Sequence, residues 1–397
     1  MKSEWITYTV QELIDKEMLE PPMDGNHGGI HPKTSDYVKS GVPFIMANDL
    51  INGKIDYSNC AFITNKQAGT LKKGFAHPGD VLITHKATIG RTALVGDEYD
   101  TIILTPQVTY YRVKHGISNL YLKYYFDSNE FQQTLANWAG SGSTRAYLGI
   151  TAQRKLPVVL PPLEIQTKIA EFGRMLDDKI ELNNKVNENL EQQAQTLYHH
   201  MFIENTSSEW KEGTLSDIAD ITMGQSPNGS SYNEDGEGTI FFQGRAEFCF
   251  RFPSIRLYTT EPKRMACAND VLMSVRAPVG DLNVAHTDCC IGRGLAAIHS
   301  KTGQQSFVLY TMFTLKEQLN VFNGEGTVFG SINRNSLNDM PIVIPSLDSI
   351  SAFEDIVAPI DAAIRNNYDE ICHLIQLRDS LLPKLISGEI NVSTLEI

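Results

Sequence analysis

The sequence predicts an α+β protein built as an internal repeat, in which two globular α/β domains are each followed by a long helix. The turn LPVVLPPLEIQ at residues 156–166 returns in close form as MPIVIPSLDSI at residues 340–350. Each turn follows short β-rich runs and precedes a polar segment with apolar residues seven positions apart. A unit that recurs at a fixed offset indicates a repeated architecture. We therefore expect four parts, residues 1–157, 158–205, 206–341 and 342–397.

Both globular parts mix short β-rich runs with one clear helical pattern. In the first part VLIT and TIILTPQVTYYRV are β-rich, and residues 119–138 are helical. In the second part TIFFQ, VLMSV and GLAAIH are β-rich, and residues 305–322 are helical. Runs of β-branched and aromatic residues are typical of strands, and an apolar stripe with a period near 3.6 is typical of a helix. The similar segments GDVLITHKATIG (79–90) and NDVLMSVRAPVG (269–280) indicate that the two domains differ in loop length.

The helical parts agree without a gap at an offset of 184 positions. The seam predicted for the first helix is Ile169, Leu176, Asn183, Leu190 and Leu197, and the equivalent seam of the second is Phe353, Ile360, Asn367, Leu374 and Leu381. A spacing of seven predicts a coiled coil, and an Asn at a seam position fixes register and partner choice at some cost in stability. Further apolar residues widen the two stripes, namely Ile180, Val186, Val357, Ile364 and Ile371. The alternative is a pair of unrelated amphipathic helices, which the unbroken offset disfavours.

The formal net charge of −13 argues at first against a nucleic-acid partner. The acidic residues, however, are concentrated in the helical parts. Residues 158–205 carry 4 Lys+Arg against 8 Asp+Glu, and residues 342–397 carry 3 against 9. Residues 1–157 are balanced, with 16 against 15. Because the distribution of charge matters more than its sum, the globular parts are able to present a basic face.

Composition places the chain among cytoplasmic globular proteins. No apolar run approaches the length of about 20 residues that a membrane span needs, and the first residues lack an apolar signal core. The six cysteines show no CxxC pair and no finger spacing, so we expect reduced thiols and no zinc site.

The usual catalytic signatures are missing from the sequence. It has no Walker P-loop, no HExxH, no GxSxG and no Gly-rich dinucleotide turn after a strand. Asp177 and Asp178 are neighbours on a predicted helix, so they cannot face each other across a substrate. His27 and His31 lie in the loop GNHGGIHP, where metal ligation is an alternative to the commoner solvated histidine. We therefore expect no metal and no cofactor in this chain.

The remaining polar motifs suit recognition of DNA. The loops GSGSTRAYL (140–148) and GEGTVFGSINR (324–334) offer backbone N–H and hydroxyl groups to phosphate oxygens. Glutamine has the groups to read adenine, and arginine those to read guanine. The candidate DNA-binding residues are Lys86, Arg91, Ser143, Thr144, Arg145, Gln225, Gln243, Arg245, Arg276, Arg293, Asn333 and Arg334. For any single cation a surface ion pair is the commoner role, but these residues recur in matching places in both halves.

The chain resembles the specificity (S) subunit of type I restriction–modification enzymes over essentially its whole length. The resemblance rests on the helices after LPPLEIQ and IPSLDSI, on QTLYHHMF and LRDSLLPKLISGEI, which close them, and on GQSP, FFQGRAEF, VRAPVGDLN and CIGRGLAAI. It implies two target recognition domains, each reading half of a split double-stranded DNA site. It also implies that the two helices form an antiparallel coiled coil, which gives the repeat a pseudo-twofold arrangement.

The resemblance further implies partners that carry the chemistry. Two methyltransferase subunits would bring S-adenosylmethionine, and restriction (motor) subunits would use ATP and Mg²⁺. Three other interpretations stay open at this point: an enzyme in its own right, such as a fused methyltransferase; a coiled-coil scaffold without DNA binding; and a stand-alone DNA-binding protein derived from this family.

Overall fold

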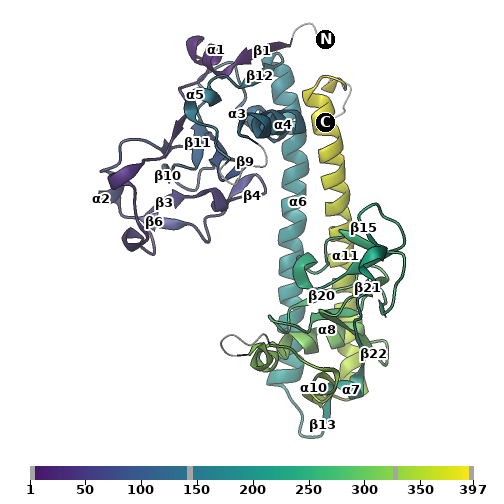
Figure 1. Cartoon of the computed structure of the whole chain (residues 1–397). Coiled ribbons are helices and arrows are strands. Elements are labelled where there is room, and N and C mark those ends of the chain that lie inside the picture. The colour runs from purple at the N-terminus through teal and green to yellow at the C-terminus, as the bar shows by residue number, and fades with distance from the viewer. Residues whose placement is uncertain (1–4, 141–145, 325–329, 393–397) are drawn as a thin grey trace. The chain divides into compact units, whose positions relative to one another are not determined.

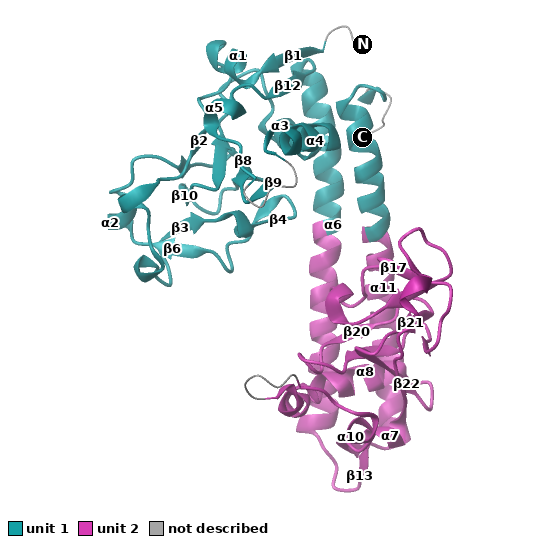
Figure 2. Cartoon of the chain, viewed as in Figure 1, with its two compact units in different colours: residues 1–180, 372–397 teal, residues 181–371 magenta. Residues whose placement is uncertain are grey.

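The computed structural model describes residues 5–140, 146–324 and 330–392, and it divides the chain into two compact units. The first unit consists of residues 1–180 and 372–397, and the second of residues 181–371 (Figure 2). The division falls inside both long helices, α6 (Leu163–Tyr198) and α11 (Leu347–Ile386), which are labelled in Figure 1 and change colour along their length in Figure 2. The domain boundaries expected from the sequence, at 157, 205 and 341, differ from this division and stay predictions.

Short strands form the body of the first unit. Two four-stranded sheets have the orders β6-β3-β10-β7 and β2-β11-β8-β9, and two-stranded sheets pair β1 with β12 and β4 with β5. The strands are β1 (Ile6–Thr9), β2 (Met23–Asp24), β3 (Val42–Ile45), β4 (Leu50–Ile51), β5 (Lys54–Ile55), β6 (Ala61–Ile63), β7 (Phe75–Ala76), β8 (Val81–Lys86), β9 (Thr88–Leu94), β10 (Ile102–Leu104), β11 (Val108–Tyr111) and β12 (Pro157–Leu160).

The second unit has a four-stranded sheet of order β14-β22-β19-β20, a five-stranded sheet of order β15-β17-β16-β21-β18, and the pair β13-β23. The strands are β13 (Lys211–Thr214), β14 (Ala219–Met223), β15 (Tyr232–Asn233), β16 (Thr239–Phe242), β17 (Leu257–Thr259), β18 (Met265–Ala266), β19 (Val271–Ser274), β20 (Leu282–Val284), β21 (Cys289–Ile291), β22 (Leu295–Ser300) and β23 (Pro341–Ile344).

The two units share one topology. The order β2-β11-β8-β9 corresponds to β14-β22-β19-β20, and β6-β3-β10-β7 corresponds to β17-β16-β21-β18. Each of the second pair of sheets contains one parallel neighbour, β3 with β10 and β16 with β21, while its other described neighbours are antiparallel. The repeat predicted from the sequence is therefore confirmed in the strand order as well as in the helices.

The short helices of the first unit are α1 (Val10–Asp15), α2 (Asn65–Ala68), α3 (Asn119–Asp127), α4 (Asn129–Trp138) and α5 (Ile150–Gln153). Those of the second are α7 (Leu215–Ile218), α8 (Gln305–Thr314), α9 (Lys316–Asn320) and α10 (Arg334–Asn338), and α6 continues into a π-helical turn at His199–Glu204. The single helix expected over residues 119–138 is divided at Ser128. This residue has extended backbone angles, and its hydroxyl accepts from the Phe131 N–H to cap α4.

Within the second unit, α6 and α11 pair in opposite directions. Asn183 of α6 donates to Glu370 of α11 at 2.7 Å, and Asn187, four residues later, accepts from Asn367 at 2.8 Å. Asn187 also donates to the Ile364 carbonyl at 3.4 Å. Residue numbers rise along one helix as they fall along the other, which confirms the antiparallel coiled coil. The two predicted seam asparagines thus lie in one polar layer, but each bonds to a neighbour rather than to the other.

Each long helix buries two positions of its heptad. On α6 the predicted position includes Ile169, Leu176 and Asn183, and the second position, which the series of sevens does not contain, includes Asn187, only 1% exposed. On α11 the more deeply buried position is that of Val357, Ile364 and Ile371, whereas the predicted residues Ile360, Asn367, Leu374 and Leu381 are half-buried. Val186 does not widen the stripe, because it is 39% exposed and lies outside the four-and-three spacing of the buried residues.

In the first unit, Asp177 of α6 accepts from Arg378 of α11 at 2.8 Å, and from the Tyr124 hydroxyl at 2.7 Å. Through these two hydrogen bonds Asp177 holds α6 against α11 and α3, so its role is structural. The core of this unit combines residues from widely separated parts of the chain, with Leu13, Tyr121 and Ile169 in the same apolar cluster as Leu385 of α11.

A buried ionic cluster ties the body of the second unit to both long helices. The Arg251 side chain is 3% exposed and forms ion pairs with Glu191 of α6, at 3.0 Å, and with Asp361 of α11. Tyr310 of α8 donates to the same Asp361 carboxylate at 2.9 Å. Burial works against the charge of Arg251, yet Asp361, Tyr310 and Glu191 together raise its pKa. Burial raises the pKa of Glu191 despite the neighbouring guanidinium.

A second contact of the same kind involves Glu354 of α11. Its carboxylate accepts from the backbone N–H groups of Ser306 and Phe307, at 3.1 and 3.0 Å, at the start of α8. These are donors that the first turn of a helix leaves without an intrahelical partner. Burial raises the pKa of Glu354, and the two backbone donors partly oppose this effect.

Candidate nucleic-acid interface

Four of the predicted recognition residues of the second unit gather around the turn between β21 and β22. The Gln225 N–H donates to the Ile291 carbonyl at 2.9 Å, and the Arg293 N–H donates to the Ser226 hydroxyl at 3.3 Å. Gly294 donates to the Gln243 carbonyl at 3.3 Å, and its own carbonyl accepts from Val275, the residue before Arg276, at 2.9 Å. The backbone therefore brings Gln225, Gln243, Arg276 and Arg293 together from four segments.

Glycine makes this close approach possible. A Cβ added at Gly292 would lie 2.8 Å from the Gln243 carbonyl oxygen, and one added at Gly294 would lie 2.9 Å from it. Both distances are shorter than a carbon and an oxygen tolerate, so only glycine fits against the end of β16. The motif IGRGL is thus required for packing at its two glycines, and Arg293 between them is exposed.

The side chains at this position are free for a ligand. Gln225, Gln243, Arg276 and Arg293 are all exposed, and none of the four side chains has a hydrogen bond or ion pair to the part of the chain that the structure describes. Amide and guanidinium groups have the donors and acceptors that read base edges in the major groove. Their chemistry suits DNA, and their assignment as DNA contacts stays a prediction.

The two Gly-rich loops have equivalent basic residues beside their C-terminal parts. Lys86 at the end of β8 forms a β-bridge with Tyr147, and Arg276 after β19 forms one with Ser331. The next residue along the chain forms an equivalent backbone hydrogen bond in each unit. The Ala87 N–H donates to the Ala146 carbonyl at 3.1 Å, and the Ala277 N–H donates to the Gly330 carbonyl at 3.0 Å. The predicted contacts Ser143, Thr144 and Arg145 lie outside the described residues, and so do residues 325–329 of the second loop.

Asn333 and Arg334 are the last two residues of the second loop and lie near the end of β19. The Ile332 N–H donates to the Val275 carbonyl at 3.0 Å, which places both residues near Arg276. The Asn333 side-chain oxygen caps α10 by accepting from Ser336 at 2.9 Å. This cap uses the acceptor of Asn333 and leaves its amide donors, while Arg334 is exposed.

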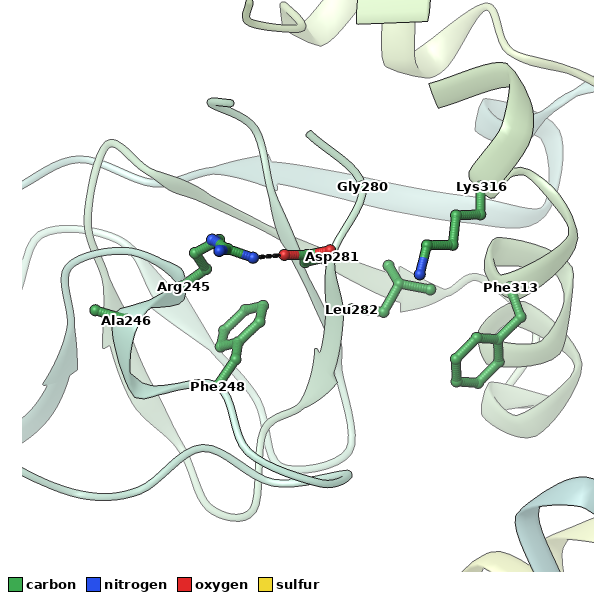
Figure 3. Close-up of a pocket in the computed structure, with 8 residues that line it drawn as sticks. All are labelled: Arg245, Ala246, Phe248, Gly280, Asp281, Leu282, Phe313 and Lys316. Carbon is green, nitrogen blue, oxygen red and sulfur yellow. Dashed lines mark hydrogen bonds and ion pairs between the residues drawn. The ribbon is translucent and has the colours of Figure 1, made fainter. Parts of the chain in front are cut away.

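Arg245 and Arg91 each line a pocket. Arg245 forms an ion pair with Asp281 in a cavity of about 440 Å³, which Phe248, Phe313 and Lys316 also line (Figure 3). Lys316 was not among the sequence candidates, because its position in a helical pattern gave no sign that it faces a pocket. Arg91 lines a cavity of about 490 Å³ in the first unit.

The histidine loop of the first unit makes local contacts. His27 Nε2 lies 2.9 Å from a carboxylate oxygen of Asp24, and His31 Nδ1 lies 3.1 Å from the Asn26 carbonyl oxygen. No group of three His, Cys, Asp or Glu side chains able to hold a metal ion occurs in the described ranges. The six cysteines are free thiols. Among the helices that the structure describes, none has the length and apolar character needed to cross a membrane.

The repeated domains, the antiparallel coiled coil and the exposed amide and guanidinium groups define a two-domain recognition protein with a helical core. A family model described as the type I restriction modification DNA specificity domain matches residues 3–192 and again residues 207–369. The chain belongs to this family, and it carries the domain twice.

Individual relatives agree over nearly the full length. The chain is 29% identical over 378 residues to the putative type I restriction enzyme MjaX specificity subunit of Methanocaldococcus jannaschii, with 90% of this chain and 89% of the relative covered. It is 25% identical over 411 residues to the MjaIX specificity subunit of the same organism, with 93% and 91% covered. The S subunit of a type I restriction–modification system from M. genitalium is similar in fold, with a TM-score of 0.59 at 14% identity and 96% of each chain covered.

Proposed function

We propose that this chain is the DNA-reading subunit of a type I restriction–modification complex. Each of its two globular domains reads one half of a split double-stranded site, and the coiled coil between them holds methyltransferase subunits. The observation that carries this proposal is the double occurrence of one domain, with exposed basic side chains at equivalent strand ends, Lys86 in the first copy and Arg276 in the second. A protein built from two such domains is suited to two half-sites that differ in sequence.

We also propose that the chain has no catalytic activity of its own. The chemistry would reside in two methyltransferase subunits with S-adenosylmethionine and in restriction subunits that use ATP and Mg²⁺. The exposed Arg276 and Arg293 suit binding of a base edge or a phosphate. The work of such a complex would take place in the cytoplasm, where the chromosome and the cofactors are found.

Methylation mapping tests the function directly. The chain is expressed with the methyltransferase subunits of its own system, and the modified sites of the host genome are compared with and without its gene. A two-part motif that depends on this gene is expected. Exchange of residues 206–341 for another recognition domain should then change one half of the motif only. A change in both halves would contradict the modular assignment.

Two further measurements separate the other functions. A coiled-coil scaffold would show no DNA binding, whereas a DNA-reading chain should bind with an affinity that falls steeply as salt rises, because phosphate contacts release counterions. The purified chain, incubated with S-adenosylmethionine and DNA without partner subunits, should transfer no methyl group. Turnover by the isolated chain would make it an enzyme in its own right.

A further inference from the structure

Two pockets that each contain an arginine, one in each unit, occupy equivalent places in the repeat. In the second unit the pocket lies between the segment after β16, the start of β20 and the helices α8 and α9 (Figure 3). In the first unit it lies between the segment after β3, the strand β9 and the end of α3. Strand β3 corresponds to β16 and β9 corresponds to β20, so two walls of each pocket are equivalent.

The backbone supports the same equivalence. Gly90 and Gly280, which occupy the same position in the similar segments 79–90 and 269–280, both have φ of +91° and both line their pocket. This left-handed conformation is one that other residues rarely adopt. Two units whose loops have drifted in length have kept this one conformation at the edge of the pocket.

Each pocket is lined by one arginine, but the arginine of the second unit belongs to a different wall from that of the first unit. In the second unit Arg245 belongs to the segment after β16, and its acceptor, Asp281, follows Gly280. In the first unit Arg91 stands in the place of Asp281, immediately after Gly90. Its Nη1 lies 3.3 Å from the carbonyl oxygen of Ala47 and 3.5 Å from that of Leu50, which belong to the segment after β3. Donor and acceptor have exchanged sides, and a guanidinium remains in the pocket.

The stability that such contacts supply does not account for their presence in both units. The Arg245 side chain is 49% exposed, and exposed ion pairs contribute only about 0–1 kcal/mol. An acceptor beside an exposed guanidinium has a second effect, since it fixes the orientation of the planar group and leaves its other N–H donors for a ligand. Guanine presents two acceptors, O6 and N7, in the major groove, and an oriented arginine binds both at once.

The second pocket also contains a cation without a partner. Lys316 extends from α9 toward Leu282 (Figure 3), and its amine has no ion pair within the described part of the chain. With Arg245 and Asp281 it gives the pocket a net positive charge, which favours approach of a polyanion. A pocket for a small anion alone would not place a carboxylate beside its arginine.

We propose that these two pockets are the points at which the two recognition domains each read a guanine of their half-site, through Arg245 in the second domain and Arg91 in the first. Asp281 is a positioning residue that orients Arg245, and the carbonyls of Ala47 and Leu50 do the same for Arg91. The inference rests on the proposed function, and it names residues that decide sequence choice in each half.

The test uses the assembled methyltransferase complex and methylation mapping, with rates measured on oligonucleotides that carry each single base change. Arg245→Lys keeps the charge and loses the two-point contact, so discrimination at one G·C pair of one half-site should fall by roughly 5- to 150-fold. Arg91→Lys should relax one pair of the other half-site. Asp281→Asn should relax the same pair as Arg245→Lys, with partial rescue by Asp281→Glu. The matched control is Arg256→Lys, an exposed arginine outside the pocket, paired with Glu234 and Glu247, which should leave the motif unchanged.

The outcomes separate the possible failures. An unchanged motif in both Arg245→Lys and Arg91→Lys, or relaxation of the same half-site by both, overturns the inference and leaves the proposed function intact. Uniform weakening on all sequences with a shallower salt dependence would identify phosphate contacts instead and also overturn it. If Arg245→Lys impairs assembly, Arg245→Gln provides the same comparison at one base pair. Absence of any motif with the unaltered complex would overturn the proposed function and the inference with it.

Discussion

Replacement of Arg251 by alanine should destabilise the second unit strongly. The Arg251 side chain is 3% exposed, and its two carboxylate partners, Glu191 and Asp361, are each 19% exposed. Removal of one member of a buried ion pair costs about 3–5 kcal/mol, because the remaining charge stays buried without compensation. Here two carboxylates lose the same cation. Arg251 has φ of +62°, a strain that alanine keeps and glycine would relieve, so alanine is the cleaner change.

The expected loss is large enough to measure in the full chain. In a unit of about 190 residues, each kcal/mol lowers Tm by about 2–4 °C, which gives a decrease of roughly 6–20 °C. Calorimetry would record the transition, and amide hydrogen exchange in β19 and β22 would assign it to the second unit. Lys185→Ala on α6, the helix that carries Glu191, is the control, because its pair with Glu181 is exposed and should contribute less than about 1 kcal/mol.

A neutral replacement of the whole cluster sharpens the test. Arg251→Met combined with Glu191→Met and Asp361→Leu removes all three charges, so most of the lost stability should return. A loss below about 1 kcal/mol for Arg251→Ala, the size expected of an exposed pair, would refute the reasoning that burial governs this cluster.

Three further changes test other parts of the structure. Asn187→Ala should cost the second unit about 1–3 kcal/mol in calorimetry, because it leaves the Asn367 amide unpaired, and leucine at both positions should restore stability; a double variant no better than the single would contradict this. Gly90→Ala and Gly280→Ala should each lower the stability of their own unit by more than about 1 kcal/mol, since both have φ of +91°, and an unchanged Tm in either would count against equivalent backbones. Because burial raises the pKa of Glu354, its ionised form weakens the fold, and the unfolding free energy of the wild type should rise relative to that of Glu354→Gln as pH falls through that raised value toward 4.5; a falling difference would show the opposite shift.

The helical part of the fold could be predicted in detail from the sequence, because a coiled-coil seam is a local pattern. The spacing of seven located Asn183 and Asn367, and the offset of 184 paired them as equivalents. The partner of Asn367 is nevertheless Asn187. A coiled-coil helix buries two positions of each heptad, and the predicted series of sevens traces only one of them, so it could not contain Asn187. The prediction that Val186 widens the apolar stripe was also wrong, because an apolar residue next to a seam position need not face the partner helix.

The sheets and the pockets were harder to predict. The parallel contact between β3 and β10 joins residues some 60 positions apart, and strands this short carry no register signal of their own. The sequence identified Gln243 and Arg293 as candidates from their side-chain chemistry near strand ends. That they lie close together depends on backbone hydrogen bonds donated by Gly292 and Gly294, which the sequence does not show. Arg91 and Asp281 already match in sequence, because each directly follows one of the similar segments 79–90 and 269–280, but only the structure shows that both line a pocket.

The division of the chain inside both helices has a consequence for its synthesis. The core of the first unit includes Leu382, Leu385, Ile386 and Val392, so that unit is completed only after the residues of the second unit have been made. The second unit is continuous from 181 to 371 and has all its residues before then. At about 5–20 residues per second, the first domain waits roughly 10–40 s after its own residues have left the ribosome. The unit whose translation begins first is therefore completed after the other, and a stop shortly after 371 would yield a complete second unit together with a first unit that lacks part of its core.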